Sequence, residues 1–434
     1  MSESGEQSRE GGGSFELRTR AVAECPLNSK EAVVRNLIAR FVVSVVAALL
    51  AGLACGDALV ASQHSQLSNY QVTNLASLGG TISRGNSINN RSWVAGYSNL
   101  PGNQSRHASL WLNGSLLDLG TLGGPNSSVA WPVKNDSGLI AGIAQTDTPD
   151  PLGEAWSCAA FFPGPTATGP TCLGFVWRSG VMSALPTLGG NNGFATGANN
   201  HGQVVGWAEN TVHDPTCVPP QVLQFRAVVW ESDGNQIHEL PPLPGDTSGA
   251  ATAVNDKGQV VGISGTCDQA VGRFTAAHAV LWENGRATNI GDLGGTSWNT
   301  PMAINQQGDV VGFAGQPGDD PDNPLLHAFL WTRHDGIKDL GALPGDVYSE
   351  AHGINERRQV VGISCDAAGS CRAFLWQNGV MTDLNTLVQA GYADVLTTAQ
   401  DINDLGEITG RAFDPVTGAR PAFLATPSPG HGGN

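Results

Sequence analysis

The sequence predicts an all-β fold, a seven-bladed β-propeller of four-stranded antiparallel blades, closed by an N-terminal strand that completes the last blade. Two observations predict it. An Asn is followed seven residues later by a Gly at seven places, and such self-similarity indicates a repeat architecture. The second observation is that the two ends of the repeat region complement each other. The seven Asn/Gly pairs are Asn89/Gly96, Asn135/Gly142, Asn199/Gly206, Asn255/Gly262, Asn305/Gly312, Asn355/Gly362 and Asn403/Gly410.

Each repeat contains four short apolar runs. In the fourth copy, SGAATAVN, GQVVG, AHAVLW and the segment around DLGG follow one another. Each run has the length of a strand and is bounded by Gly, Asn, Asp or Pro. Since the repeats show no sustained 3.6-residue apolar period, we expect strands rather than helices.

The first two runs of each repeat are joined by a tight turn. Asn255 at the first position and Gly258 at the fourth favour a type I turn, which makes an antiparallel hairpin. Ser92 and Arg358 replace the Gly in two copies, where the turn would need a non-Gly residue at its exit.

Repeat length and the chain ends predict a closed ring. The Asn-to-Asn spacings of 46, 64, 56, 50, 50 and 48 residues suit propeller blades with insertions. Residues 70–75 match the fourth run before any first run appears, and residues 421–425 match a third run with no fourth run after it. We therefore expect a propeller over residues 62–425, in which the N-terminal strand pairs with the last blade and removes an exposed sheet edge.

Residue size predicts the order of strands within a blade. Inner strands crowd the axis, and most residues four and two positions before each Asn are small. The first run should therefore be innermost and the fourth outermost. The second blade departs from the pattern with Trp131 and Lys134, so its inner strand should be shifted or intrude on the channel.

These repeats resemble the HAF family of bacterial extracellular repeat proteins, which has a β-propeller-like organisation. HAFLW stands at 327–331, HAVLW at 278–282, HASLW at 107–111 and DLGTLGG at 118–124, and GQVVG occurs at 202–206 and 258–262. The resemblance covers residues 70–425. It implies secretion or surface display and transfers no catalytic residues.

Composition limits the kinds of partner. The net charge is −16, and no Lys/Arg cluster is visible in the sequence. Nucleic acid and anionic lipid are therefore poor partners, because phosphate binding needs such clusters. A monomer is expected, in contact with a membrane only through a leader or lipid anchor.

The N-terminal region resembles an export leader. Within residues 1–61, the apolar stretch 41–54 has signal-peptide length and is too short for a comfortable membrane span. Cys55 directly follows it in an approximate lipoprotein box, so ordinary cleavage and lipidation at Cys55 are both open, with cleavage favoured. Residues 426–434 are expected to be a disordered tail.

Six cysteines lie in the connections between second and third strands, and six cysteines allow 15 pairings. Proximity in the sequence favours Cys158–Cys172 and Cys365–Cys371, which leaves Cys217–Cys267 to bridge neighbouring blades. A zinc site is the rival, but CxxC spacing is absent.

Function should lie on the loop-rich face, formed by the second-to-third and fourth-to-first connections. This face carries most of the length variation, notably 145–172, 209–224 and 315–326. Loops on a rigid scaffold concentrate binding residues. The opposite face has short turns and is expected to be structural.

Two residue rows are expected to be structural. His107, His278 and His327 occupy one equivalent position in separate blades, which favours strand-end packing over a metal site. The Trp row that closes the third strands could suggest a carbohydrate platform, but its register favours packing between blades. It comprises Trp111, Trp177, Trp230, Trp282, Trp331 and Trp376.

Residues that break the repeat pattern are the candidate ligand-binding set. Aromatic rings that stack on sugars, together with polar groups that bind hydroxyls, favour recognition of a glycan. The candidates are Trp131, Trp298, Tyr348, Glu350, His352, Asp246, Asp346 and Arg84.

We expect a secreted or cell-surface binding module that recognises a glycan or protein, with no catalytic residues, cofactor or resident metal assigned. The alternatives are an extracellular polysaccharide lyase or glycoside hydrolase with its site at the axial mouth, and a structural matrix component. Calcium at Asp319, Asp320 and Asp322 is a further alternative, because hard oxygen ligands cluster there, although a solvated acidic loop is favoured.

Overall fold

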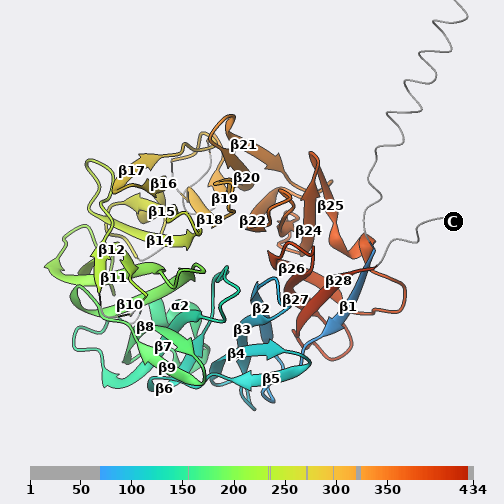
Figure 1. Ribbon diagram of the computed structural model, residues 1–434, viewed down its shortest axis with the longest axis horizontal. Helices are drawn as coiled ribbons and strands as arrows, with labels where there is room; N and C mark the ends of the chain where they lie inside the picture. The colour runs from blue at the N-terminus through green and yellow to red at the C-terminus, as the bar shows by residue number, and fades with distance from the viewer. Residues whose placement is uncertain are drawn as a thin grey trace, which may run out of the picture. The chain divides into compact units, whose positions relative to one another are not determined.

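The computed structural model describes residues 69–428, apart from 155, 233, 235, 270–271, 297 and 319–323. These residues form seven four-stranded antiparallel sheets arranged as a β-propeller around a central axis (Figure 1), which confirms the predicted fold class. The leader with segment 41–54, Cys55, and Asp319, Asp320 and Asp322 lie outside the described residues. None of the described helices is long and apolar enough to cross a membrane.

The strands follow one another from the axis outward in each of the first four blades. Blade 1 is β2 (Ser83–Ile88), β3 (Val94–Asn99), β4 (Arg106–Leu112) and β5 (Ser115–Asp118). Blade 2 is β6 (Gly123–Ser128), β7 (Ile140–Pro149), β8 (Pro170–Arg178) and β9 (Val181–Ala184). Blade 3 is β10 (Gly189–Ala198), β11 (Val204–His213), β12 (Leu223–Trp230) and β13 (Ile237–Glu239). Blade 4 is β14 (Ser248–Val254), β15 (Val260–Gly265), β16 (His278–Glu283) and β17 (Arg286–Asn289).

The remaining blades keep this order until the last, where the outer strand comes from the N-terminal side. Blade 5 is β18 (Thr300–Ile304), β19 (Val310–Gly315), β20 (Leu326–Thr332) and β21 (Gly336–Gly341). Blade 6 is β22 (Tyr348–Ile354), β23 (Val360–Cys365), β24 (Cys371–Gln377) and β25 (Val380–Asp383). Blade 7 is β26 (Val395–Ile402), β27 (Ile408–Phe413), β28 (Ala422–Pro427) and β1 (Tyr70–Asn74). Short helical segments are α2 (Trp156–Phe161), η1 (Gly164–Thr166), η2 (Thr275–Ala277) and η3 (Leu384–Leu387).

The first hairpin of each blade is held by its repeat Asn. In blade 4, the N–H of Gly258 donates to the carbonyl of Asn255 over 3.1 Å, which closes the predicted turn. The Oδ1 of Asn255 accepts from the N–H groups of Lys257 and Gln259, each over 3.1 Å. Ser92 and Arg358 adopt the same left-handed backbone as the Gly they replace, with φ of 58° and 56°. The same backbone hydrogen bond closes the turn in six repeats, whereas in blade 2 the N–H of Gly138 donates to the Oδ1 of Asn135 over 3.1 Å.

The repeat Gly is required by a bulge in the inner strand. The pairing of β14 with β15 shifts register between Ala251 and Ala253. This bulge brings the carbonyl of Ala250 so close to Gly262 that a Cβ there would lie 2.1 Å from the oxygen. The other six repeat glycines face a carbonyl in the same way, at 1.8 to 2.3 Å from the position of a Cβ. The Asn–Gly spacing therefore encodes a turn together with a bulge.

Small residues line the axis because neighbouring inner strands approach closely, as predicted. A Cβ on Gly353 of blade 6 would lie 2.8 Å from the Cα of Asp401 in blade 7. In blade 2, β6 already ends at Ser128, and Lys134 extends past blade 1 to pair with Asp401, with 2.6 Å between Nζ and Oδ1. The predicted departure of this blade is therefore both an early strand end and an intrusion on the channel.

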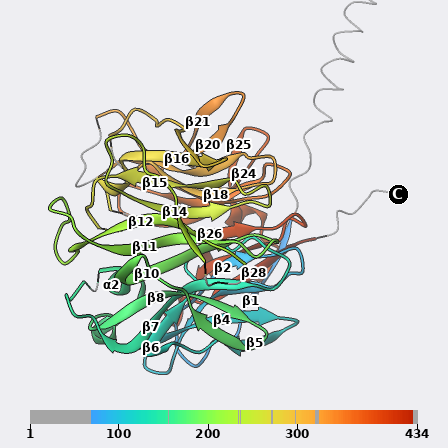
Figure 2. The same ribbon diagram turned by 60° about the vertical axis from the view of Figure 1, so that its left-hand side comes forward.

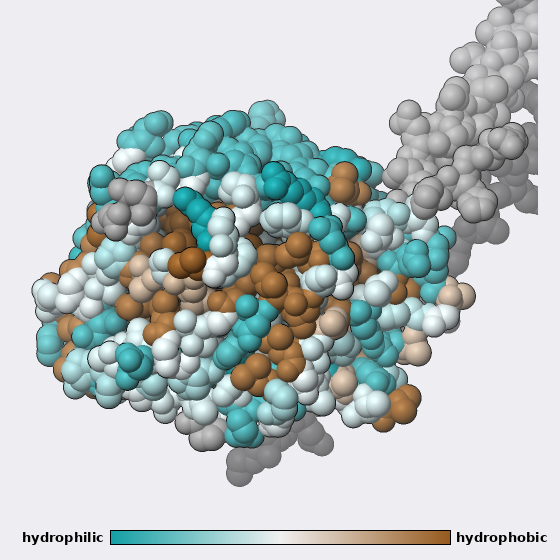
Figure 3. All heavy atoms as spheres, turned by 60° about the horizontal axis from the view of Figure 1, so that its bottom comes forward, coloured by the Kyte–Doolittle hydropathy of each residue, from teal (hydrophilic) through white to brown (hydrophobic). Residues whose placement is uncertain are grey.

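The sheets of successive blades stack face to face (Figure 2), and apolar clusters join them. The indole N–H groups of Trp111, Trp230 and Trp282 donate to the carbonyls of Ala76, Pro186 and Pro241 over 2.7 to 2.8 Å. These carbonyls belong to the connections that lead into each blade, so the Trp row packs between blades as predicted. Figure 3 shows that apolar surface, in brown, is also exposed over a broad area bordered by polar residues in teal.

The equivalent histidines each contact an Asp at the end of their strand. The Nδ1 atoms of His107 and His327 lie 2.8 and 3.0 Å from the carboxylates of Asp118 and Asp339, on the fourth strands of their own blades. His278 contacts Asp246 instead, over 3.0 Å. The three histidines thus lie in three separate blades, and each contacts a different Asp.

Closure of the ring is the last feature of the fold. β1 pairs antiparallel with β28, from Tyr70 opposite Pro427 to Asn74 opposite Phe423, which confirms the predicted N-terminal strand (Figure 1). The start of the predicted tail was wrong, because Thr426 and Pro427 pair with β1 and the N–H of Ser428 donates to the carbonyl of Asn69 over 2.7 Å. Residues 429–434 lie outside the described residues.

Candidate ligand-binding pocket at the loop-rich mouth

Equivalent positions of several repeats meet in a pocket of about 320 Å³, here called the mouth pocket. The residues five positions before the repeat Asn line it in blades 1, 2, 5, 6 and 7, and equivalent positions of separate blades can meet only near the axis. Because these residues lie toward the beginning of the inner strands, the pocket opens on the loop-rich face. Its walls are Arg84, Ala130, Trp131, Phe161, Trp298, Thr300, Met302, Phe313, Glu350, His352, Ile363, Thr398, Gln400 and Arg411.

Most of the predicted ligand-binding residues gather here. Arg84, Trp131, Trp298, Glu350 and His352 line the pocket, and Tyr348 donates a hydrogen bond to Glu350. They come from four different segments of the chain, in blades 1, 2, 5 and 6, so only the closed ring brings them together.

Two predicted candidates, Asp246 and Asp346, do not line the mouth pocket. Asp246 accepts from the hydroxyl of Ser264 over 2.6 Å and contacts His278. Asp346 accepts from Ser364 over 2.7 Å and pairs with Arg372 over 2.8 Å. Both carboxylates bind residues of the connection and strands that begin a blade. They therefore lie at the same end of the propeller as the pocket, but farther from the axis than its lining residues.

The aromatic wall of the pocket is continuous with the core. Trp131 packs edge-on against Phe161 and Phe194, with 5.5 Å between ring centroids in both cases. Phe194 continues this contact to Trp207, and the surrounding apolar cluster includes Cys158, Cys172 and Cys267. The Nε1 of Trp131 is buried and has no acceptor within the described part of the chain. An indole donor is therefore available at a rigid wall.

Trp298 is a second tryptophan of the pocket lining and has an uncommon backbone conformation. Its φ is 60°, in the left-handed region that bulky residues rarely occupy. Such conformations concentrate at ligand-binding sites, because the surrounding structure must stabilise them.

Glu350, His352 and Tyr348 form one hydrogen-bonded unit. The Nε2 of His352 lies 2.7 Å from the carboxylate of Glu350, and its Nδ1 lies 3.3 Å from the carbonyl of Ala399. Burial alone would raise the pKa of Glu350, but His352, the Tyr348 hydroxyl and Arg84 lower it overall. Burial and the Glu350 charge raise the pKa of Tyr348 well above its usual value, so its hydroxyl stays protonated. The unit therefore presents a carboxylate that is already held by two donors.

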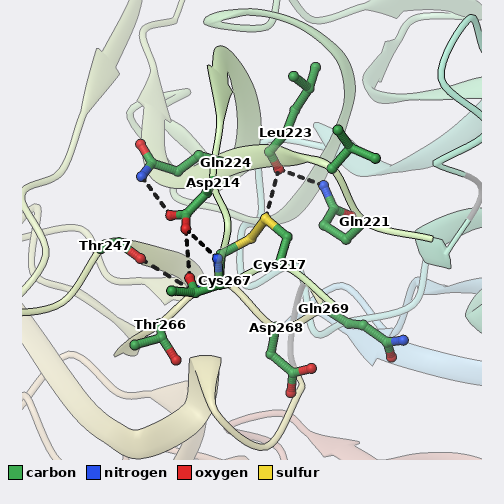
Figure 4. The surroundings of a disulfide bond; sticks show 12 residues. Asp214, Cys217, Gln221, Leu223, Gln224, Thr247, Thr266, Cys267, Asp268 and Gln269 are labelled. Carbon is green, nitrogen blue, oxygen red and sulfur yellow. Dashed lines mark hydrogen bonds between the residues drawn. A yellow bond between two sulfur atoms is a disulfide. The ribbon is translucent and has the colours of Figure 1, made fainter. Parts of the chain in front are cut away.

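Disulfides fix the loops around the mouth. The three bonds are Cys158–Cys172, Cys217–Cys267 and Cys365–Cys371, which confirms the predicted pairing. Cys217–Cys267 joins the long loop of blade 3 to blade 4 (Figure 4). Beside it, the carboxylate of Asp214 accepts from Gln224 over 3.0 Å, and the N–H of Val218 donates to the carbonyl of Asp268 over 3.0 Å. The loop is thus attached to the next blade by covalent and polar contacts.

Several pocket residues were not anticipated from the sequence. Arg411 follows the repeat Gly of blade 7, where the other repeats have Tyr97, Ile143, Trp207, Ile263, Phe313 and Ile363. A charged residue at an otherwise apolar or aromatic position is the signal that could have identified it. Phe161 gave no such signal, because it lies in an insertion without a repeat equivalent.

The opposite mouth of the channel is built from backbone turns. A cavity of about 190 Å³ lies among the repeat Asn residues and the residues that follow them. Its polar groups are engaged with one another; the N–H of Gln306, for example, donates to Glu356 over 2.7 Å. Within the described residues, no group of three or more His, Cys, Asp or Glu side chains is arranged to hold a metal ion.

Comparison with known proteins supports the fold alone. No model of a known family matches the sequence, and no curated protein matches it. An oligogalacturonate lyase solved with manganese is similar at a TM-score of 0.50 and 12% identity, over 84% of this chain and 94% of that one. A gluconolactonase from Xanthomonas campestris matches at a TM-score of 0.32 and 12% identity, over 59% of this chain and 79% of that one. AofleA from Arthrobotrys oligospora matches at a TM-score of 0.26 and 9% identity, over 73% of this chain and 85% of that one.

Proposed function

We propose that the protein is an exported binding module that recognises a glycan in the mouth pocket. The observation that carries the proposal is the placement of Trp131 and Trp298 on the same small pocket as Glu350, His352 and Arg84. Flat rings contact the apolar faces of sugars, and convergent polar groups bind the hydroxyls. The three disulfides are compatible with an extracellular location, as the resemblance to the HAF repeats implies.

The chemistry of the pocket favours binding over hydrolysis. A glycosidase needs two carboxyl groups across the scissile bond, roughly 5–10 Å apart. Glu350 is the single carboxylate among the described residues that line the mouth pocket. It is ionised and held by two donors, so it is poorly suited to act as a general acid.

A lyase is the second candidate, because similar propellers include an oligogalacturonate lyase and because His352 and Tyr348 could in principle move protons. In the structure, both ring nitrogens of His352 face acceptors, and Tyr348 keeps its proton. Neither group presents a free basic site to a ligand. Binding is therefore the function that we propose.

A glycan array tests the proposal. The protein from residue 62 onward should bind a defined set of glycans, and Trp298→Ala should reduce that signal at least tenfold. Trp93→Ala, which removes a partly buried aromatic ring that is not part of the mouth pocket, is the matched control and should leave it unchanged. Absence of binding to any glycan would reject the proposal, and release of unsaturated sugars from a bound polysaccharide would favour the lyase.

A further inference from the structure

The mouth pocket contains a cluster of three arginines. Unlike the paired arginines elsewhere in the protein, these three have no close carboxylate partner among the described residues. Arg84 and Arg411 line the pocket, and Arg106 lies behind them. All three surround one buried side chain, Tyr97. The guanidinium carbons of Arg84 and Arg106 lie 5.5 and 4.0 Å from the centre of its ring, and Arg411 is hydrogen-bonded to it.

No carboxylate of the described residues forms a close ion pair with this cluster. Elsewhere in the protein, Arg358 and Arg372 lie 2.6 and 2.8 Å from an Asp oxygen. Among the described residues, by contrast, no carboxylate lies within 4.0 Å of the guanidinium groups of Arg84, Arg106 or Arg411. Glu350, the acidic residue of the pocket lining, is hydrogen-bonded by His352 and Tyr348, and the charge of Arg84 acts on it only without a close contact. The cluster is therefore a concentration of positive charge in a chain of net charge −16.

The pKa values of the cluster residues show the same excess of positive charge. Burial lowers the pKa of Arg411, and the neighbouring charge of Arg84 lowers it further. Burial alone would raise the pKa of Tyr97, but the positive charges of Arg84, Arg106 and Arg411 lower it overall. The Nε of Arg84 is moreover buried without an acceptor in the described part of the protein. The Nη1 of Arg106 donates to the carbonyl of Phe161 over 2.8 Å, and Arg411 bonds Tyr97, but neither partner is a carboxylate. Partly buried guanidinium groups without a carboxylate partner are costly, and an anionic ligand would lower that cost.

We propose that the mouth pocket is specific for an acidic saccharide, whose carboxylate or sulfate group binds Arg84 and Arg411 while its ring contacts Trp298. This inference rests on the proposed function, because it names the class of glycan recognised at the same site. Guanidinium groups bind carboxylates and sulfates through paired hydrogen bonds, which gives both affinity and orientation. The pocket volume of about 320 Å³ is at the lower end of small-molecule sites, so it suits a short part of a chain rather than a long segment.

Calorimetric titration of the unmodified protein tests this inference first. The probes are oligomers of uronic acids, the same oligomers with their carboxyl groups converted to methyl esters, and sulfated and unsubstituted neutral oligosaccharides. We expect an acidic series to bind at least tenfold more tightly than its neutral counterpart, with an affinity that decreases as salt is added. Binding of the uronate or of the sulfated series identifies which anionic group is recognised.

Variants locate the binding group. Arg411→Gln should weaken binding of the acidic series at least tenfold, whereas Arg411→Lys, which keeps the charge, should weaken it less. Arg333→Gln removes a guanidinium from an exposed pair with Glu283 and is the matched control, which should bind normally. Thermal unfolding of each variant shows whether it is folded, and the comparison of probes on the unmodified protein does not depend on any variant.

The possible outcomes separate this inference from the proposed function. If neutral glycans bind as tightly as acidic ones and Arg411→Gln has no effect, the inference is wrong while glycan recognition stands. If the folded protein binds no saccharide of any series, both are wrong.

Discussion

Gly362 illustrates how single residues are constrained by the repeat. A Cβ at this position would lie 1.8 Å from the carbonyl oxygen of Glu350 and 2.8 Å from the ring of Phe374. The clash would be with backbone, which cannot move without displacing the bulge of β22. The same residue therefore supports the blade and positions the pocket residue Glu350.

Gly362→Ala should destabilise the protein by about 3 kcal/mol or more, because overpacking here involves the main chain. Gly369→Ala is the control, since this glycine has a φ of 79° but open space around its Cα, and should cost only about 1–2 kcal/mol. Unfolding temperatures compared by calorimetry measure both. A Gly362→Ala protein as stable as the control would contradict the role that we assign to the bulge.

Glu209 makes stability depend on pH. It is buried beside Glu154, and burial, followed by the Glu154 charge, raises its pKa to about 7. A carboxyl group whose pKa is raised in the folded state stabilises the fold fully below its unfolded pKa of about 4.5, and this contribution is lost as the pH rises through about 7. We therefore expect the free energy of unfolding to fall by roughly 3 kcal/mol between pH 5 and pH 8 on account of this group.

Glu209→Gln should flatten that part of the profile, because the amide does not titrate. Glu231→Gln, a partly exposed carboxyl group that follows the same blade's third strand, should keep the original slope. Thermal unfolding at several pH values measures the effect. An unchanged slope in Glu209→Gln would assign the pH dependence to another group.

At the scale of elements, the insertions of blades 2 and 3 on the loop-rich face are each attached to the neighbouring blade. Glu154, in the insertion of blade 2, accepts hydrogen bonds from the N–H groups of Val222 and Leu223 over 2.8 and 2.5 Å. The Cys217–Cys267 disulfide attaches the insertion of blade 3 to blade 4. These attachments stabilise the rim around the mouth pocket.

The two kinds of disulfide should differ in their contribution to stability. Cys217–Cys267 spans 50 residues and should contribute roughly 4 kcal/mol by restricting the unfolded chain, whereas Cys365–Cys371 spans 6 and should contribute roughly 2 kcal/mol. Replacing each pair by serines and comparing unfolding temperatures tests this order. An equal or reversed loss would show that the unfolded-chain restriction is not the main term.

At the scale of the whole molecule, the ring is closed at two places, at its outer edge and near the propeller axis. On the outside, β1 completes the last sheet. Near the axis, the side-chain amide of Asn403 donates to the carbonyl of Asn89 over 2.9 Å, and Asp404 and Asn90 continue a second series of contacts across the same junction. Five further repeat Asn residues donate to the repeat Asn of the next blade, whereas Asn135 donates to Leu139.

Removal of the closing strand should have a large effect. A protein that begins at Leu75 lacks Tyr70, which is buried in the core of blade 7, and exposes the edge of β28. Compared with a protein that begins at Asn69, we expect a lower unfolding temperature and self-association through the free edge. Size-exclusion chromatography with light scattering measures the association. A stable monomer of the shorter protein would show that the contacts near the axis suffice for closure.

The sequence by itself determined the number of blades, the strand order, the closing strand and the disulfide pairs. The blades, their strand order and the closing strand depend on repeated local chemistry, such as the Asn turn and the small inner residues, so seven copies reinforce one interpretation. The disulfide pairs followed instead from the proximity of cysteines in the sequence. It also identified Trp298, Tyr348 and Glu350 as departures from the repeat. Only the tertiary structure decided which departures share a pocket, excluding Asp246 and Asp346 and adding Arg411, Phe161 and the unpaired charge around Tyr97. The reason is physical: the repeat fixes height along the axis, whereas radius and side-chain partners depend on how separate blades converge.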